Sequence, residues 1–192
     1  MGKICAVFGG SRGIGKAVAE LLARKGCHLA IIARNLEVAQ NTARSLGAGH
    51  LALSCDVSRE QEVQHAFEEI QRNLGPINYL VNAAGINRDG LLLRTKTEDI
   101  VSQIHTNLLG TMLTCKAAVK SMIHHQGGAI VNIGFIHTEM TAHLEEDELK
   151  KAIPLGRFGD PHEVAQAVLF LLESPYVTGS TLIVDGGLQL LI

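Results

Sequence analysis

A glycine-rich loop near the start of the chain constrains the fold more than any other stretch. Gly9, Gly13 and Gly15 lie between a short apolar run, residues 4–8, and an amphipathic pattern, residues 14–25. A strand, a glycine loop and a helix in this order are typical of a dinucleotide site, although a tight turn without a ligand is the alternative. We expect Gly9 to allow the sharp turn, Gly13 to let backbone amides approach a pyrophosphate, and Gly15 to let the helix pack against the strand. The first amides of the helix would then face the phosphates.

Two arginines indicate which dinucleotide the loop would accept. A second apolar run, residues 29–33, ends at Arg34 and Asn35, about 20 residues past the loop, where the contact to the adenosine ribose is expected. An acidic residue there would bind the 2′-hydroxyl of NAD, whereas Arg34 and the loop residue Arg12 suit a 2′-phosphate. The sequence therefore predicts NADP(H). A solvated arginine at the end of a strand is the alternative interpretation of Arg34.

Strand patterns and helix patterns alternate along the chain without an internal repeat. Further strands are expected at residues 50–55, 77–81 and 129–133, and helices at residues 36–46, 58–74 and 97–123. The chain has 192 residues, 46% of them hydrophobic, which is enough for a single domain with its own core, residues 1–192. The alternation predicts an α/β fold of the Rossmann type. Its doubly wound parallel sheet would carry helices on both faces and bind ligands at the carboxyl ends of the strands.

The composition argues against several classes of partner. A net charge of −2 disfavours nucleic acid or an anionic membrane as the main partner, and no apolar run is long enough to span a bilayer. The four cysteines lack the spacing of a zinc site, so we expect no metal and small buried thiols in a soluble protein of a reducing compartment. The first strand begins by residue 3 or 4, so we expect no cleavable presequence.

Motifs spread over most of the chain resemble the short-chain dehydrogenase/reductase family. The glycine loop resembles its cofactor loop, with Phe8 where most members have threonine, and residues 82–85 resemble its Asn-Asn-Ala-Gly signature with alanine in second place. Asp56 and Val57 match the pair that holds the adenine, and Asn107 matches the helix asparagine of the catalytic tetrad. The candidate cofactor contacts are Gly9, Ser11, Arg12, Gly13, Ile14, Gly15, Arg34, Asn35, Asp56, Val57, Asn82, Ala83, Ala84, Gly85, Ile136, His137 and Thr138.

The chain departs from this family at the residues that deliver the proton. The resemblance implies a serine after the fifth strand and a Tyr-x-x-x-Lys motif on the next helix, but Tyr79 and Tyr176 are the two tyrosines and neither is followed by lysine four residues later. Gly134 runs directly into Phe135, as if one helix and one strand of the family fold had been removed. Asn107 is then the single tetrad member that remains as a candidate catalytic residue.

The missing segment has structural consequences. Residues 181–185 should still form the last strand, and a right-handed crossover could place it directly beside the fifth strand. The lost helix normally contributes to the family's subunit interface, so tetramer assembly is doubtful. We also expect an exposed apolar face on the long helix around Leu108, Met112 and Val119.

Within the family, the chain is similar to the type-four carbonyl reductases. That likeness implies NADPH-dependent reduction of 3-oxoacyl-acyl carrier protein or quinones in fatty-acid synthesis, in the mitochondrial matrix. It also implies assembly with further copies or with 17β-hydroxysteroid dehydrogenase type eight. With the acid-base set missing, we expect retained cofactor binding and impaired or absent catalysis. A non-catalytic NADP(H)-binding subunit of full-length reductase and an unstable splice-type product are the alternatives.

Overall fold

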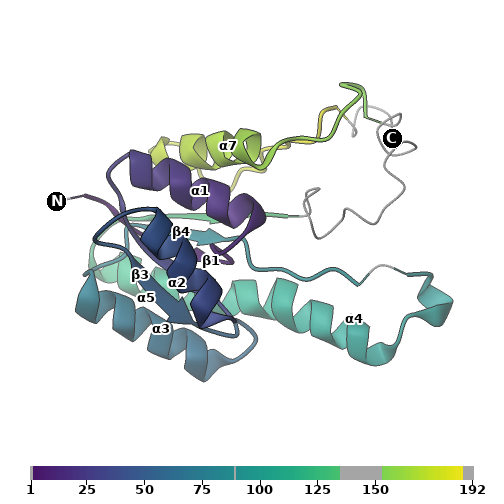
Figure 1. Ribbon diagram of the computed structural model, residues 1–192, viewed down its shortest axis with the longest axis horizontal. Coiled ribbons are helices and arrows are strands. Elements are labelled where there is room, and N and C mark those ends of the chain that lie inside the picture. The colour runs from purple at the N-terminus through teal and green to yellow at the C-terminus, as the bar shows by residue number, and fades with distance from the viewer. Residues whose placement is uncertain (1, 89, 135–152, 188–192) are drawn as a thin grey trace.

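The protein forms a parallel sheet between layers of helices, and the computed structural model describes residues 2–88, 90–134 and 153–187 (Figure 1). The strands are β1 (Ile4–Phe8), β2 (His28–Ala33), β3 (Leu51–Ser54), β4 (Tyr79–Asn82) and β5 (Ala129–Asn132). They run in the order β3-β2-β1-β4-β5, and every neighbouring pair is parallel. This order confirms the doubly wound α/β fold. The strand order reverses between β1 and β4, where such sheets bind their ligands.

Helices cover both faces of the sheet. They are α1 (Gly13–Arg24), α2 (Leu36–Ser45), α3 (Glu60–Asn73), η1 (Leu92–Arg94), α4 (Thr97–Gln103), η2 (Ile104–Leu109), α5 (Gly110–His124) and α7 (Pro161–Glu173). One buried cluster joins α1, α2 and α7 to residues such as Val7 and Ile31, and a second joins α3 and α5 to Phe8 and Ile32. Because alternate strand residues face opposite sides, apolar runs such as residues 4–8 serve both clusters.

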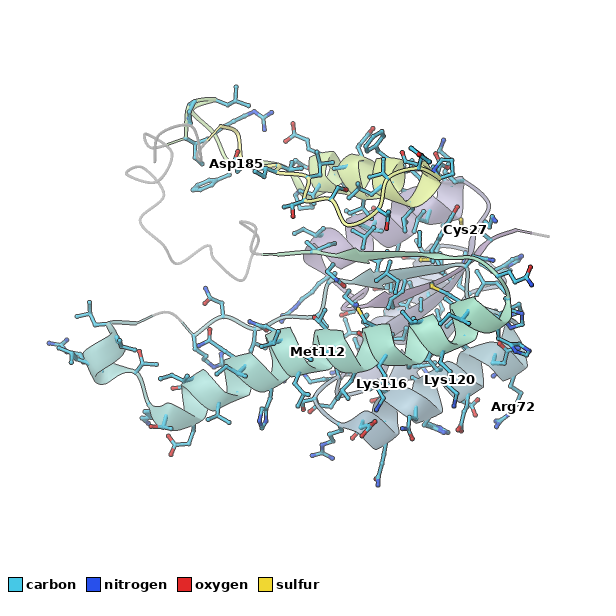
Figure 2. The ribbon with its side chains drawn as sticks, turned by 180° about the vertical axis from the view of Figure 1, so that it is seen from behind. Cys27, Arg72, Met112, Lys116, Lys120 and Asp185 are labelled. Carbon is cyan, nitrogen blue, oxygen red and sulfur yellow. The ribbon has the colours of Figure 1, made fainter. Side chains whose placement is uncertain are left out.

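The expected helix over residues 97–123 is one long helical rod made of α4, η2 and α5. Its middle, η2, is a π-helix, a rare form that is frequent at functional sites. The rod extends beyond the sheet at its α4 end (Figure 1). As expected, its outer face is apolar and exposed: Leu108 is 58% exposed, Met112 59% and Val119 43% (Figure 2).

The spacing of aspartate, proline and glutamate at positions 160, 161 and 163 predicts a helix start, and the structure confirms it at α7. Asp160 is the N-cap and accepts from the His162 amide, Pro161 is the first helical residue, and the Glu163 carboxylate accepts from the Asp160 amide. This capping box satisfies amides that would otherwise lack partners. Ser58 and Gln61 have the spacing of a capping box, but Ser58 does not cap α3. Its amide and hydroxyl both donate to Asp56 Oδ1, and the helix begins at Glu60.

The expected last strand is wrong. Residues 181–184 form no strand, and no backbone hydrogen bond joins them to any other described residue. Their β-branched and apolar side chains suit a strand, but strand propensity is expressed only where a neighbouring backbone completes the ladder. The sheet therefore ends at β5 within the described residues, and β4 is its one partner there.

The thiols behave largely as expected. Cys5, Cys27 and Cys55 are buried and free, whereas Cys115 is half-buried. Burial, with the nearby Glu62 and Asp56 carboxylates, raises the pKa of Cys55 to about 12. Within the described ranges, no helix combines the length and apolar character that crossing a membrane requires.

Candidate functional site

The glycine loop adopts a conformation that side chains would prevent. Gly9 and Gly13 have φ values of +79° and +54°, in the left-handed region that favours glycine. A Cβ on Gly9 would lie 2.6 Å from the Ala83 carbonyl, and a Cβ on Gly15 would lie 2.2 Å from the Gly9 carbonyl oxygen. The loop is therefore folded tightly over the start of α1 and against the end of β4. The sharp turn expected at Gly9 is present, whereas a Cβ on Gly15 would meet the backbone of the loop rather than β1.

Neighbouring elements fix the loop in place. The Gly9 amide donates to the Ile32 carbonyl at 2.8 Å, so the loop begins beside the end of β2. The Thr42 hydroxyl of α2 donates to the Ser11 carbonyl at 3.2 Å. Arg12 is the N-cap of α1, but no side chain caps this helix. The first amides of α1 are thus left for another acceptor, and the positive end of the helix dipole lies beside them.

A cavity of about 420 Å³ lies beyond the carboxyl ends of β2 and β3, and no residue of the glycine loop is in its lining. Arg34 and Asp56 line it together with Ser58, and the α4–η2 rod forms its other wall through residues such as Val101 and His105. Arg34 is an exposed side chain that lines this open cavity. The two residues predicted to contact the adenosine end come from different strands and meet in this one cavity.

The charge of Asp56 is stabilised in this cavity. Burial alone would raise the pKa of its carboxyl group, but hydrogen bonds from Ser58 and the positive charges of Arg34 and Arg59 lower it below its usual value. Asp56 thus remains an acceptor for a donor group such as an exocyclic amine. Its amide donates to Glu62 Oε2 at 2.8 Å, which fixes the turn after β3.

Three further residues predicted to contact the cofactor, Asn35, Val57 and Ile14, have structural roles. The Asn35 side chain accepts from the Val38 amide at 3.2 Å and so caps α2. Val57 is buried beneath α5, where a Cβ on Gly110 would lie 2.6 Å from its side chain. Ile14 is buried in the core under α1. These side chains position the site rather than line the cavity.

Asn82 is held inside the protein rather than in the cavity. Its Nδ2 donates to Asn132 Oδ1 at 2.9 Å, and its Oδ1 accepts from the Thr114 hydroxyl at 2.9 Å. Asn82 is 4% exposed and Thr114 is fully buried. The network ties β4 to β5 and α5, and so it holds the following Ala83 and Ala84 against the glycine loop.

Replacing Thr114 by valine should destabilise the fold by about 1–2 kcal/mol, because the nearly isosteric side chain leaves Asn82 Oδ1 buried without its donor. Urea unfolding followed by circular dichroism measures the loss. The matched control is Thr111→Val, whose hydroxyl bonds the Asn107 carbonyl near the surface and should cost less than about 0.5 kcal/mol. Equal losses in the two variants would contradict the role of the network.

Asn107, the expected catalytic residue, clamps a loop. Its Oδ1 accepts from the Ile86 amide at 2.9 Å, and its Nδ2 donates to the Ile86 carbonyl at 2.8 Å. A Cβ on Gly85 would lie 3.4 Å from the same oxygen. The residue lies in the π-helix η2, which brings the rod against the chain that follows β4. The described contacts are thus those of a positioning residue.

Both tyrosines lie away from the glycine loop. Tyr79 opens β4 at its amino end, opposite Cys5 and Ala129, whereas the loop follows the carboxyl end of β1. Burial, with the Cys27 and Glu173 charges, raises its pKa further. Tyr176 is 99% exposed beyond α7. Neither phenol is therefore near the carboxyl edge of the sheet. Ile136, His137 and Thr138 lie outside the described residues.

The described site fits a dinucleotide. The tight loop at Gly9 and Gly15 and the uncapped start of α1 provide amides for phosphates, and Arg34, which lines a cavity at the same edge of the sheet, provides a cation for a further anionic group. Sequence reasoning missed Thr42, Glu62 and Thr114, which hold the site from other elements. A polar residue within an otherwise apolar helix stripe, such as Thr114, was the one signal available.

Two family models match the chain. Residues 3–145 match the short chain dehydrogenase model, and residues 132–189 match a model described as enoyl-(acyl carrier protein) reductase. The first match alone covers more than half of the sequence and contains every described residue of the site.

Curated proteins are similar over their full length. The chain is 56% identical to a human 3-oxoacyl-acyl-carrier-protein reductase, with 100% of both chains covered. It is 55% identical to carbonyl reductase family member 4 of Xenopus laevis, with 99% of each covered. A Vibrio cholerae 3-oxoacyl-acyl-carrier-protein reductase is 31% identical over 99% of this chain and 98% of its own.

Proposed function

This chain belongs to the short-chain dehydrogenase/reductase family, and from that premise we propose that it binds NADP(H) but has impaired or no carbonyl reduction. Membership implies a nicotinamide dinucleotide as cofactor. One observation carries the proposal: the glycine loop is intact, whereas both tyrosines lie away from it. The cofactor, when bound, supplies a hydride, and a carbonyl substrate also needs a proton from the protein.

The residues that would hold the cofactor are those of the described site. The amides at the start of α1 would bind the pyrophosphate, and Arg34 would bind a 2′-phosphate on the adenosine ribose. Asp56 would accept from the adenine. The clamp between Asn107 and Ile86 would hold the chain beyond β4 in place.

The loss of catalysis rests on the missing proton donor. The alignment with the human relative spans 237 positions, whereas this chain has 192 residues, so it contains positions that this chain lacks. That difference supports an internal deletion between Gly134 and Phe135, which would remove the serine and the Tyr-x-x-x-Lys motif together. Asn107 remains, but its side chain is already occupied by Ile86.

The names of the relatives guide the choice of substrate, and the family likeness guides the choice of compartment and partners. The names of those relatives favour 3-oxoacyl thioesters and other carbonyl compounds as the substrate class. We propose quinones as a second class, because a quinone accepts hydride more readily. We propose the mitochondrial matrix as the compartment. Assembly with full-length subunits or with 17β-hydroxysteroid dehydrogenase type eight would make this chain a non-catalytic NADP(H)-binding subunit. This second candidate is favoured by the exposed face of α5 around Met112.

An Arg34→Ala variant tests the cofactor assignment. Loss of a charge-assisted contact to the 2′-phosphate should weaken NADPH binding by about 10- to 100-fold, equivalent to about 1.5–3 kcal/mol, with little change for NADH. Fluorescence titration with each cofactor measures the ratio. Arg94→Ala is the matched control, because Arg94 lies on η1 and does not line the cavity. A variant that still prefers NADPH as strongly as the wild type would contradict the role of Arg34. A wild-type chain that prefers NADH would contradict the assignment of NADP(H).

A further inference from the structure

A second cavity, of about 1560 Å³, opens at the edge of the sheet. Residues 128–134, which include all of β5, form one wall, and residues 177–185 form the opposite wall. Val119 and Met122 of α5 and Val168 and Leu171 of α7 close the two remaining sides. We call this cavity the edge slot. It has a backbone on each side and a helix above and below, which are the surroundings of a strand within a helix-covered sheet.

Both walls of the edge slot present unpaired backbone. Ala129 and Ile133 donate to the carbonyls of Asn78 and Asn82, so Ile130 and Asn132 direct their amides away from β4 and into the slot. Residues 181–184 on the opposite wall have no backbone hydrogen bond to another described residue. In Figure 2 the chain from α7 to Asp185 and the strand β5 run in the same direction. The slot is therefore bounded by two parallel, open edges.

The size and charge of the edge slot define its occupant. A four-residue strand within a layered sheet occupies roughly 600 Å³, from its rise, strand spacing and layer thickness, so the slot has room for one strand with its side chains. The parts of β5, α5 and residues 177–184 that line it are uncharged, and the charged residues of the lining are Lys3, Glu173 and Asp185. An uncharged strand of apolar side chains is the complementary occupant.

The chain itself carries such a strand. Leu182, Ile183 and Val184 are 46%, 52% and 40% exposed, although an unbroken apolar run of this kind is typical of a strand with both faces covered. In its own chain this segment lies across the edge slot from β5 and makes no backbone hydrogen bond to it. It follows α7, and α7 packs on α1 through buried residues such as Val168 and Leu172. In a second copy, the α7 that precedes this segment is not packed on this chain's α1, so the segment can approach the slot from outside.

We propose that two copies of this chain interlock through their edge slots. Residues 181–184 of each copy enter the edge slot of the other copy. Each segment therefore forms a wall of the slot in its own chain and fills the slot in the partner chain. The strand order across the two-fold axis becomes β5, the partner's segment, the chain's own segment and the partner's β5. Neighbouring strands in this order run antiparallel. Three new ladders form, both slots are filled, and the arrangement closes at the dimer.

The test is the mass of the full chain in solution together with amide hydrogen exchange. Light scattering at rising concentration should approach twice 20.6 kDa, and the amides of Ile130, Asn132 and residues 182–184 should be protected only in the dimer. Ile183→Pro removes a ladder amide and should give a monomer, whereas Ile183→Thr, which keeps a β-branched side chain, should remain dimeric. Met112→Ser on the outer face of α5 should also remain dimeric.

Three results would overturn the proposal. The first is a monomer at every concentration. The second is a dimer that survives Ile183→Pro and is lost with Met112→Ser, which would place the contact on α5. The third is free exchange of the Ile130 and Asn132 amides in a dimer. If Ile183→Pro fails to fold by circular dichroism, the exchange data on the wild type decide the question. None of these readouts depends on cofactor binding or turnover.

Discussion

Replacing Gly15 by alanine is expected to abolish NADPH binding. The added Cβ would lie 2.2 Å from the Gly9 carbonyl oxygen, 2.8 Å from the Gly9 carbonyl carbon and 3.1 Å from the Gly10 Cα. All three atoms belong to the backbone, so no side chain can rotate away, and the loop must leave the start of α1. Loss of even two charge-assisted hydrogen bonds to phosphate amounts to a weakening of at least roughly 100-fold.

The control for this variant is Gly127→Ala. Gly127 has no atom within 4 Å of an added Cβ, and it lies in the turn before β5, away from the glycine loop. Its NADPH affinity and melting temperature should match the wild type, whereas Gly15→Ala should also lose about 1–3 kcal/mol of stability through overpacking. Fluorescence titration measures the NADPH affinity, and thermal denaturation measures the stability. Wild-type affinity in Gly15→Ala would show that the cofactor does not use the glycine loop.

Reduction of a 3-oxoacyl thioester is expected to be about 100- to 10,000-fold slower than in a full-length relative. This range is the usual contribution of a positioned general acid, and this chain has no tyrosine near the carboxyl edge of the sheet to supply it. A quinone accepts hydride without prior protonation of a weakly basic carbonyl, so its reduction should fall by a smaller factor.

Initial rates measured with acetoacetyl thioester and with a quinone, under saturating NADPH, test this expectation. The internal control is the ratio of the two rates, which does not depend on the fraction of active protein. A ratio shifted toward the quinone relative to a full-length relative supports the missing proton donor. An unchanged ratio, with both rates near those of the relative, would mean that another group delivers the proton.

Local patterns predicted much of this fold because the physics that sets them is local. The glycine loop, the cap at Asp160 and the buried run of β1 follow from turn geometry, helix capping and strand alternation. Arg34 could be placed because it ends a strand beside the switch point of the sheet. Such features depend on neighbours in sequence or on the fold class alone.

The features that sequence reasoning missed depend on partners far along the chain. Residues 181–184 have the composition of a strand but lack a neighbouring backbone. Asn82 matched a cofactor signature, yet its side chain serves Asn132 and Thr114, 50 and 32 residues away. Ser58 had the spacing of a helix cap, but Asp56 offered it a nearer acceptor. Which of several possible partners a side chain or backbone group bonds is decided only when the elements are packed together.

The most direct test of this account measures NADPH binding and NADPH oxidation on one sample of the protein. NADPH fluorescence is titrated against the purified wild-type chain to saturation, and acetoacetyl thioester is then added while nicotinamide absorbance is followed. Retention of the nucleotide site without proton delivery predicts saturable binding at one cofactor per chain and then almost no loss of absorbance. Failure to bind NADPH, or oxidation of it at the rate of a full-length relative, would contradict this conclusion.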